Sequence, residues 1–137
     1  MFKKIDHVGI AVTDLEEATK IYESLFGKGP DHVEDVEDQQ VRTVFFGVGE
    51  SKVELLFPTS PESPIAKSLK KRGPGVHHIC FEVSNIKEHL RELKEKGVRL
   101  IDEEPRMGAH NKKIAFIHPK GLGGVLVELS ESIDSDE

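Results

Sequence analysis

The chain has 137 residues, 36% of them hydrophobic and 32% charged, a composition typical of one globular domain with a charged surface. A net charge of −6 argues against a general nucleic-acid or membrane surface, and no apolar run approaches the roughly 20 residues that span a bilayer. The single cysteine, Cys80, excludes an internal disulfide framework; with an N-terminus unlike a signal peptide, it indicates a cytoplasmic protein.

The first half of the chain predicts a strand, a helix and further strands. Residues 5–12 alternate in hydrophobicity as a strand does, and a helical spacing of apolar residues follows over 15–26. Thr13 with Glu16 predicts a capping box at the start of this helix, and Gly27 predicts its end. The remaining strands of this half are expected near 33–35 and at 41–48 and 52–57.

The second half repeats this order after a Pro-bounded linker, 58–74, that holds a short helix around 65–72. Its elements are a strand at 76–83, a helix at 86–96, and strands near 98–101 and at 113–118 and 125–130. We therefore expect one α+β domain over 1–137, built from two tandem βαβββ modules that form a curved mixed sheet. Its parts are module one at about 4–57, the linker 58–74, module two at about 75–130 and an acidic tail, 131–137.

Side-chain parity predicts which faces of these elements are buried. Alternate residues of a strand share a face, so the large apolar residues of each strand need a helix to cover them. On the strands these sets are Val8, Ile10 and Val12; Ile79, Phe81 and Val83; Val53, Leu55 and Phe57; and Val125, Val127 and Leu129. The covering stripes on the helices are Leu15, Ala18, Tyr22 and Leu25, and Ile86, Leu90 and Leu93.

The two halves also repeat one histidine and one glutamate. Residues 5–12 read IDHVGIAV and residues 76–83 read VHHICFEV, which places His7 opposite His78 at a separation of 71 positions. The closing strands KVELLF and VLVELS place Glu54 opposite Glu128. The separation from histidine to glutamate is 47 residues in the first half and 50 in the second, which indicates a three-residue difference in one loop.

The repeated residues predict a metal site. Each histidine and each glutamate lies on the strand face opposite the large apolar residues, and a carboxylate there is costly to bury unless it is paired or coordinated. Two neutral imidazoles and two carboxylates would neutralise a divalent cation and leave positions open for substrate. The candidate ligands are His7, Glu54, His78 and Glu128. His110 and His118 are candidates for substrate contact, and Cys80 is expected to be a small packing residue.

These features resemble the vicinal oxygen chelate superfamily, which includes glyoxalase I and extradiol dioxygenases. Over residues 4–130 the chain is similar to the family of methylmalonyl-CoA epimerases within it. The segments that carry the resemblance are IDHVGIAV (5–12), SPIAKSL (63–69), GVHHICFEV (75–83), GAHNKKIAFIHPK (108–120) and GGVLVEL (123–129).

The resemblance implies a homodimeric isomerase that binds an acyl-CoA substrate and a divalent ion, with cobalt favoured and manganese, nickel or zinc as alternatives. The implied reaction interconverts (R)- and (S)-methylmalonyl-CoA through a metal-stabilised enolate. The implied ligands are the same four residues, and Glu54 and Glu128 would also exchange the proton on opposite faces of the intermediate. A third-strand glutamate proposed as an acid/base residue in some epimerases aligns with Thr43, so that role is not transferred.

Two further functions fit the pattern. Glu54 favours glyoxalase I, a lactoylglutathione lyase, because that enzyme has glutamate at this position where some epimerases have glutamine. A non-catalytic small-molecule-binding member of the superfamily would not need the four-ligand set. The CoA phosphates are expected to meet Lys112, Lys113 and Lys120, or the basic cluster from Lys67 to Arg72.

Overall fold

The computed structural model describes residues 1–133, and the chain divides into two compact units. The N-terminal unit comprises residues 7–77, and the C-terminal unit comprises residues 1–6 together with those from 78 onward. Strands β1 (Phe2–Ala11) and β5 (Gly75–Val83) each contribute residues to both units. The expectation of a single domain stays a prediction, and residues 134–137 of the expected acidic tail lie outside the described part of the chain.

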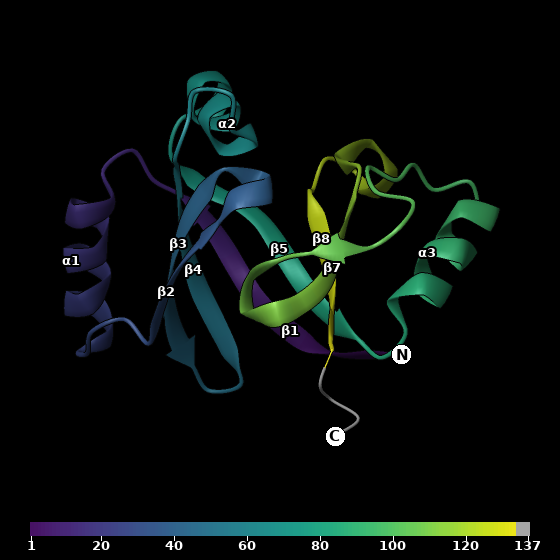
Figure 1. Ribbon diagram of the computed structural model, residues 1–137, viewed down its shortest axis with the longest axis horizontal. Coiled ribbons are helices and arrows are strands. Elements are labelled where there is room, and N and C mark those ends of the chain that lie inside the picture. The colour runs from purple at the N-terminus through teal and green to yellow at the C-terminus, as the bar shows by residue number, and fades with distance from the viewer. Residues whose placement is uncertain (134–137) are drawn as a thin grey trace. The chain divides into compact units, whose positions relative to one another are not determined.

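The N-terminal unit has the predicted order of elements. After β1 come α1 (Leu15–Phe26), β2 (His32–Val36), β3 (Val41–Val48), β4 (Ser51–Pro58) and α2 (Pro64–Arg72). The strand order is β2-β3-β4-β1; β1 pairs with β4 in parallel, and the other neighbours are antiparallel. Figure 1 shows α1 lying to one side of β2, β3 and β4. Its apolar residues pack in a core cluster with residues of β3 and β4.

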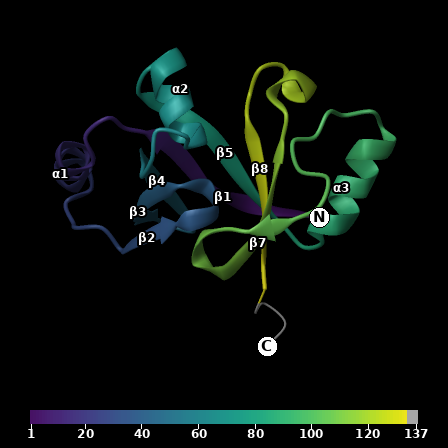
Figure 2. The ribbon, with the colours of Figure 1, turned by 45° about the horizontal axis from the view of Figure 1, so that its top comes forward.

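The C-terminal unit repeats this order from β5 onward. Its further elements are α3 (Ile86–Glu95), β6 (Arg106–Met107), β7 (Lys112–Ile117) and β8 (Val127–Ser132). Its strand order is β1-β5-β8-β7-β6; β5 and β8 run parallel, whereas β7 pairs antiparallel with β8 and with β6. Figure 2 shows α3 beside β7. Two βαβββ arrangements, each with parallel and antiparallel pairs, confirm the predicted fold class.

Helix α1 packs as predicted along most of its stripe. Leu15, Ala18 and Tyr22 contact a core cluster of Val12, Val44, Phe46 and Leu55. The fourth residue of the helix that packs against this cluster is Phe26. The predicted fourth residue, Leu25, is 67% exposed, so that prediction was wrong by one position. The predicted capping box was also wrong, because its N-cap is not Thr13. Asp14 is the N-cap and accepts a hydrogen bond of 3.0 Å from the backbone N–H of Glu17.

Helix α3 covers the second core, which confirms its predicted stripe. Ile86, Leu90 and Leu93 pack with Val83 and with the apolar residues of β7 and β8. Asn85 is the N-cap of this helix, and its side chain accepts from the backbone N–H of Glu88 at 3.3 Å. Each unit therefore buries one face of its sheet beneath one helix and leaves the other sheet face for the polar residues of interest.

Two predictions for the second half were wrong. The expected strand at 98–101 contains only an isolated bridge between Leu100 and Ile117, and the outer strand β6 lies further along the chain. Strand β8 begins at Val127, which leaves Val125 46% exposed in the preceding turn. The positive φ angles of Gly123 and Gly124 keep this stretch out of extended geometry. Strand β8 continues through Ser132, two residues into the stretch expected as tail.

Candidate functional site

In the N-terminal unit the structure brings His7 and Glu54 together. The register of β1 and β4 places Gly9 directly beside Glu54, and His7 lies two residues earlier on the same face of β1. His7 Nε2 lies 2.9 Å from Glu54 Oε1. Both side chains are more than 90% buried. The glycine at position 9 leaves the space beside the carboxylate open to the imidazole.

In the C-terminal unit the same arrangement holds His78 and Glu128. The register of β5 and β8 places Cys80 beside Glu128, and His78 lies two residues before Cys80. His78 Nε2 lies 2.9 Å from Glu128 Oε1, and both side chains are again more than 90% buried. The repeat in the sequence therefore reproduces a contact geometry, the pair of one imidazole and one carboxylate, at equivalent places in the two units.

A phenylalanine completes each pair, and sequence reasoning missed it. Phe45 is the cross-strand neighbour of Glu54, and Phe116 is the cross-strand neighbour of Glu128. The ring of His7 lies 6.4 Å from that of Phe45 at an interplanar angle of 87°, and the corresponding values for His78 and Phe116 are 5.6 Å and 81°. Both contacts are edge-to-face, a favourable geometry that fixes the orientation of the imidazole. We call each group a His–Glu–Phe set.

A sequence signal for these phenylalanines was present. Phe45 and Phe116 are separated by 71 positions, the same offset that relates His7 to His78. The three-residue difference between the halves therefore falls after the phenylalanine, in the connection to the strand of the glutamate. That connection is the two-residue turn between β3 and β4 in the first half and the stretch between Ile117 and Val127 in the second.

The chemistry of these pairs suits a divalent cation. A buried carboxylate beside a buried imidazole is stable when the two share a proton or when both coordinate a metal. Neutral imidazole nitrogen and carboxylate oxygen are donors that divalent transition metals accept. Ser130 lies two residues beyond Glu128 on β8, and its buried Oγ has no hydrogen-bond partner among the described residues. Such an atom is commonly satisfied by a bound water or ligand.

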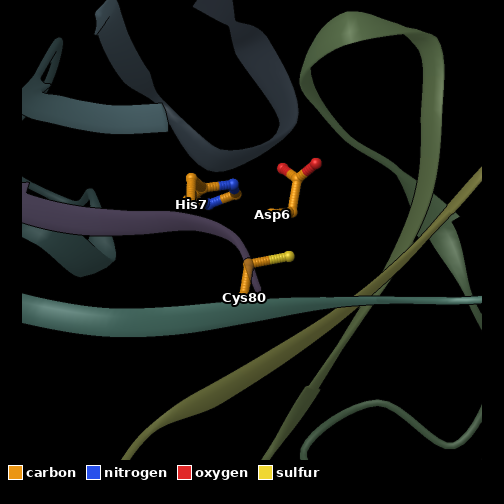
Figure 3. Close-up of side chains that lie close together, drawn as sticks. All are labelled: Asp6, His7 and Cys80. Atoms are coloured by element: carbon orange, nitrogen blue, oxygen red, sulfur yellow. The ribbon is translucent and has the colours of Figure 1, made fainter. Parts of the chain in front are cut away.

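Other candidate residues take different roles. Cys80 is fully buried, and its thiol lies within 4.8 Å of a carboxylate oxygen of Asp6 on β1. Figure 3 shows these two side chains together. Thr43 is buried and donates from Oγ1 to the backbone carbonyl of Glu34 at 2.8 Å. His110 lies in a turn with φ of 58°, in the left-handed region that non-glycine residues rarely adopt.

His118, in the HPK run, directly follows β7 and caps the short 3-10 helix Pro119–Leu122. Its Nδ1 accepts from the backbone N–H of Lys120 at 3.1 Å, which fixes the ring at the start of the connection to β8. Desolvation, followed by the nearby positive charges of Arg99 and Lys120, lowers the pKa of His118. The imidazole is therefore held neutral to lower pH than an ordinary histidine, and its Nδ1 can keep accepting.

The chain is similar over most of its length to proteins named as methylmalonyl-CoA epimerases. The chain is 43% identical over 130 residues to human mitochondrial methylmalonyl-CoA epimerase, covering 94% of this chain and 74% of that protein. It is 41% identical over 133 residues to the ethylmalonyl-CoA/methylmalonyl-CoA epimerase of Cereibacter sphaeroides, covering 96% and 99%. Among solved structures, a variant of Streptomyces coelicolor methylmalonyl-CoA epimerase in complex with 2-nitronate-propionyl-CoA matches with a TM-score of 0.93 and 37% identity. That match covers 98% of this chain and 97% of the other.

The family model for the Glyoxalase/Bleomycin resistance protein/Dioxygenase superfamily matches residues 6–116. Enzymes of this superfamily use divalent metals, which is the chemistry that buried histidine–glutamate pairs fit. The match includes three of the four candidate ligands and both phenylalanines, and only Glu128 lies beyond its end. The chain therefore belongs to the Glyoxalase/Bleomycin resistance protein/Dioxygenase superfamily.

Proposed function

We propose that this protein is a metal-dependent methylmalonyl-CoA epimerase that interconverts the (R) and (S) forms of methylmalonyl-CoA. The observation that carries the proposal is the buried histidine–glutamate pair that recurs in both units with the same 2.9 Å contact. Relatives named as epimerases match more than 90% of the chain at over 40% identity, which supports this choice of reaction within the superfamily.

The four residues of the two pairs hold the ion in this proposal. His7, His78, Glu54 and Glu128 would provide two nitrogen and two oxygen donors, a set that divalent transition metals accept. When bound, the ion supplies a Lewis acid that stabilises negative charge on the thioester oxygen of the substrate. Cobalt is our first choice, with manganese, nickel and zinc as alternatives.

The two glutamates also move the proton. One carboxylate removes the proton from the carbon between thioester and carboxylate, and the electron pair of the broken C–H bond passes into the enolate. The other glutamate, which starts the step as a protonated carboxylic acid, donates its proton to the opposite face. This inverts the configuration and leaves the two glutamates with exchanged protonation states. Each glutamate is paired with its own histidine at 2.9 Å, so the two carboxylates have similar partners.

The acyl-CoA chain is expected to meet a basic surface outside the His–Glu–Phe sets. Lys112 is an unsuitable phosphate contact, because its ammonium group already lies 2.7 Å from the carboxylate of Asp6. Lys113 and Lys120 therefore stay candidates, as does the basic last turn of α2, which holds Lys70, Lys71 and Arg72. The homodimer and the cytoplasmic location stay predictions.

The test combines metal analysis with an isotope exchange assay. Purified protein is depleted of metal, reloaded with Co²⁺ and incubated with (S)-methylmalonyl-CoA in D₂O. We expect deuterium at the carbon between the two carbonyl groups and formation of the (R) epimer, both only in the reloaded sample. Activity only toward the glutathione hemithioacetal of methylglyoxal would assign the protein as a glyoxalase I instead. A protein that binds no divalent ion would contradict both enzymatic functions and favour a binding role.

A further inference from the structure

A buried ion cluster that includes no residue of the two His–Glu–Phe sets lies in the C-terminal unit. Lys112 Nζ lies 2.7 Å from Asp6 Oδ1 and 3.4 Å from Glu82 Oε1, and Lys3 approaches Glu82 at 3.9 Å. The side chains of Asp6, Lys112 and Glu82 are only 4%, 14% and 13% exposed. By contrast, Lys94 and Glu103 of the same unit pair at 2.8 Å with both side chains more than 60% exposed.

Stability alone is a weak explanation for this cluster. Taking charged groups out of water costs several kcal/mol, and well-packed apolar residues of similar volume often stabilise a protein as well or better. Burial by itself lowers the pKa of Lys112, but the hydrogen bond and the charge of Asp6, with those of Glu82, outweigh it and raise the pKa. The ammonium group is therefore held charged inside the unit, and its geometry is specified by two acceptors.

The three buried members lie on strands that carry residues of the proposed site. Asp6 immediately precedes His7 on β1, and Glu82 lies on the same face of β5 as His78, four residues later. Lys112 begins β7, which carries Phe116 on the same face. Since β5 and β8 lie between β1 and β7 in the strand order, Lys112 reaches across two strands to contact Asp6.

Lys112 also ends an unusual turn. His110 and Asn111 have φ angles of 58° and 55°, and two successive non-glycine residues in the left-handed region cost of the order of 1–3 kcal/mol each. Such a conformation persists only when neighbouring contacts hold it. The hydrogen bond from the backbone N–H of Gly108 to the carbonyl of Lys112 closes the turn, and the buried ammonium group of Lys112 anchors it to β1 and β5.

We propose that Lys112 is a positioning residue for metal binding, which acts by locking Asp6 and Glu82 so that His7 and His78 keep the orientation in which they coordinate. This inference rests on the proposed function, because it needs these histidines to be ligands. In this proposal Lys112 contacts neither substrate nor ion and acts through Asp6 and Glu82. Outer residues that orient metal ligands typically contribute about 10- to 100-fold to metal affinity, and we expect an effect of that size.

The experiment compares Lys112→Met with Lys94→Met as the matched control. Both variants remove one ammonium group of a close ion pair in the same unit, but only the first removes a buried one. The affinity for Co²⁺ is measured by competition with a chelator, and the visible absorption spectrum of bound Co²⁺ reports its coordination geometry. We expect Lys112→Met to weaken Co²⁺ binding about 10- to 100-fold and to change the spectrum, and Lys94→Met to alter neither.

A folded Lys112→Met protein with unchanged Co²⁺ affinity and spectrum would overturn the inference. If that variant does not fold, Glu82→Gln is measured in its place. Glu82 lies at the outer side of the cluster beside the half-exposed Lys3, so this change should disturb the fold less. Weaker Co²⁺ binding by this variant supports the inference, and unchanged binding overturns it.

Wild type and His78→Ala separate the failure of this inference from the failure of the proposed function. If the wild type does not bind Co²⁺, the proposed function falls together with this inference. If His78→Ala loses Co²⁺ binding while Lys112→Met binds as the wild type does, this inference alone is removed.

Discussion

The two units have the same His–Glu–Phe set but differ in the lengths of their connecting segments and outer strands. Both units place histidine, glutamate and phenylalanine in the same register, with edge-to-face rings and 2.9 Å contacts. The connection between the strands of phenylalanine and glutamate is a two-residue turn after β3 and a much longer stretch after β7. The outer strand is five residues long in the N-terminal unit and two in the C-terminal unit. The register of each His–Glu–Phe set is therefore the same in both units, although the connecting segments differ in length.

Replacing a histidine should give the largest effect and tests whether the two pairs are equivalent. We expect His7→Ala and His78→Ala each to weaken Co²⁺ binding by more than about 100-fold, because each removes a proposed ligand rather than an outer residue. Epimerisation should fall to the limit of detection in both variants. Calorimetric titration with Co²⁺ measures the first effect. Normal binding by one of the two variants would show that only one unit supplies the ligands.

Replacing a glutamate tests whether the two pairs contribute equally to proton transfer. Glu54→Gln and Glu128→Gln keep an oxygen that can bind the ion but remove the base, so we expect kcat to fall about 10²- to 10⁴-fold. Each variant should retain deuterium exchange from D₂O into one epimer of methylmalonyl-CoA and lose it with the other. Equal exchange of both epimers in both variants would contradict a role for these carboxylates on opposite faces.

The phenylalanines test whether the two sets contribute alike to stability. Phe45 and Phe116 are 2% and 8% exposed, and replacement of a buried phenylalanine by alanine usually costs about 3–5 kcal/mol of unfolding free energy. We expect both Phe45→Ala and Phe116→Ala to lose stability in this range, measured by urea denaturation. As a control, Phe2→Ala removes a phenylalanine that is 55% exposed and should cost clearly less.

Replacing a helix cap should give the smallest loss of stability in either unit. Asp14 and Asn85 each accept a backbone hydrogen bond at the start of the helix that covers their unit. Replacing either by alanine should cost about 1 kcal/mol. Thr13→Ala serves as the control, because Asp14 rather than Thr13 caps α1 in the structure. A larger loss for Thr13→Ala than for Asp14→Ala in thermal denaturation would restore the capping box expected from the sequence.

The sequence predicted most of the fold because its signals were local and periodic. The bounds of α1 and β3 match residue for residue, since clear stop signals and helical or alternating spacing mark them. Strand β6 could not be predicted, because two residues are too few to show a period. The cap of α1 was misplaced because Thr13 and Asp14 are both good N-cap residues and are each followed three positions later by glutamate.

For the candidate site, sequence reasoning found the residues that repeat and missed those that support them. Histidine and glutamate stand out in apolar strands, whereas Phe45 and Phe116 resemble ordinary core residues. The contact of Lys112 with Asp6 could not be predicted, because 106 positions separate them and no repeat relates them. Burial of that pair depends on how the strands of the C-terminal unit curl, which no local pattern encodes.

The division of β1 between the two units has a consequence for any truncated form of the chain. Its first residues belong with the second half of the chain and its last residues with the first half, and β5 is divided in the reciprocal way. A polypeptide that carried only one of the two repeats would therefore leave part of its first strand without the residues it packs against.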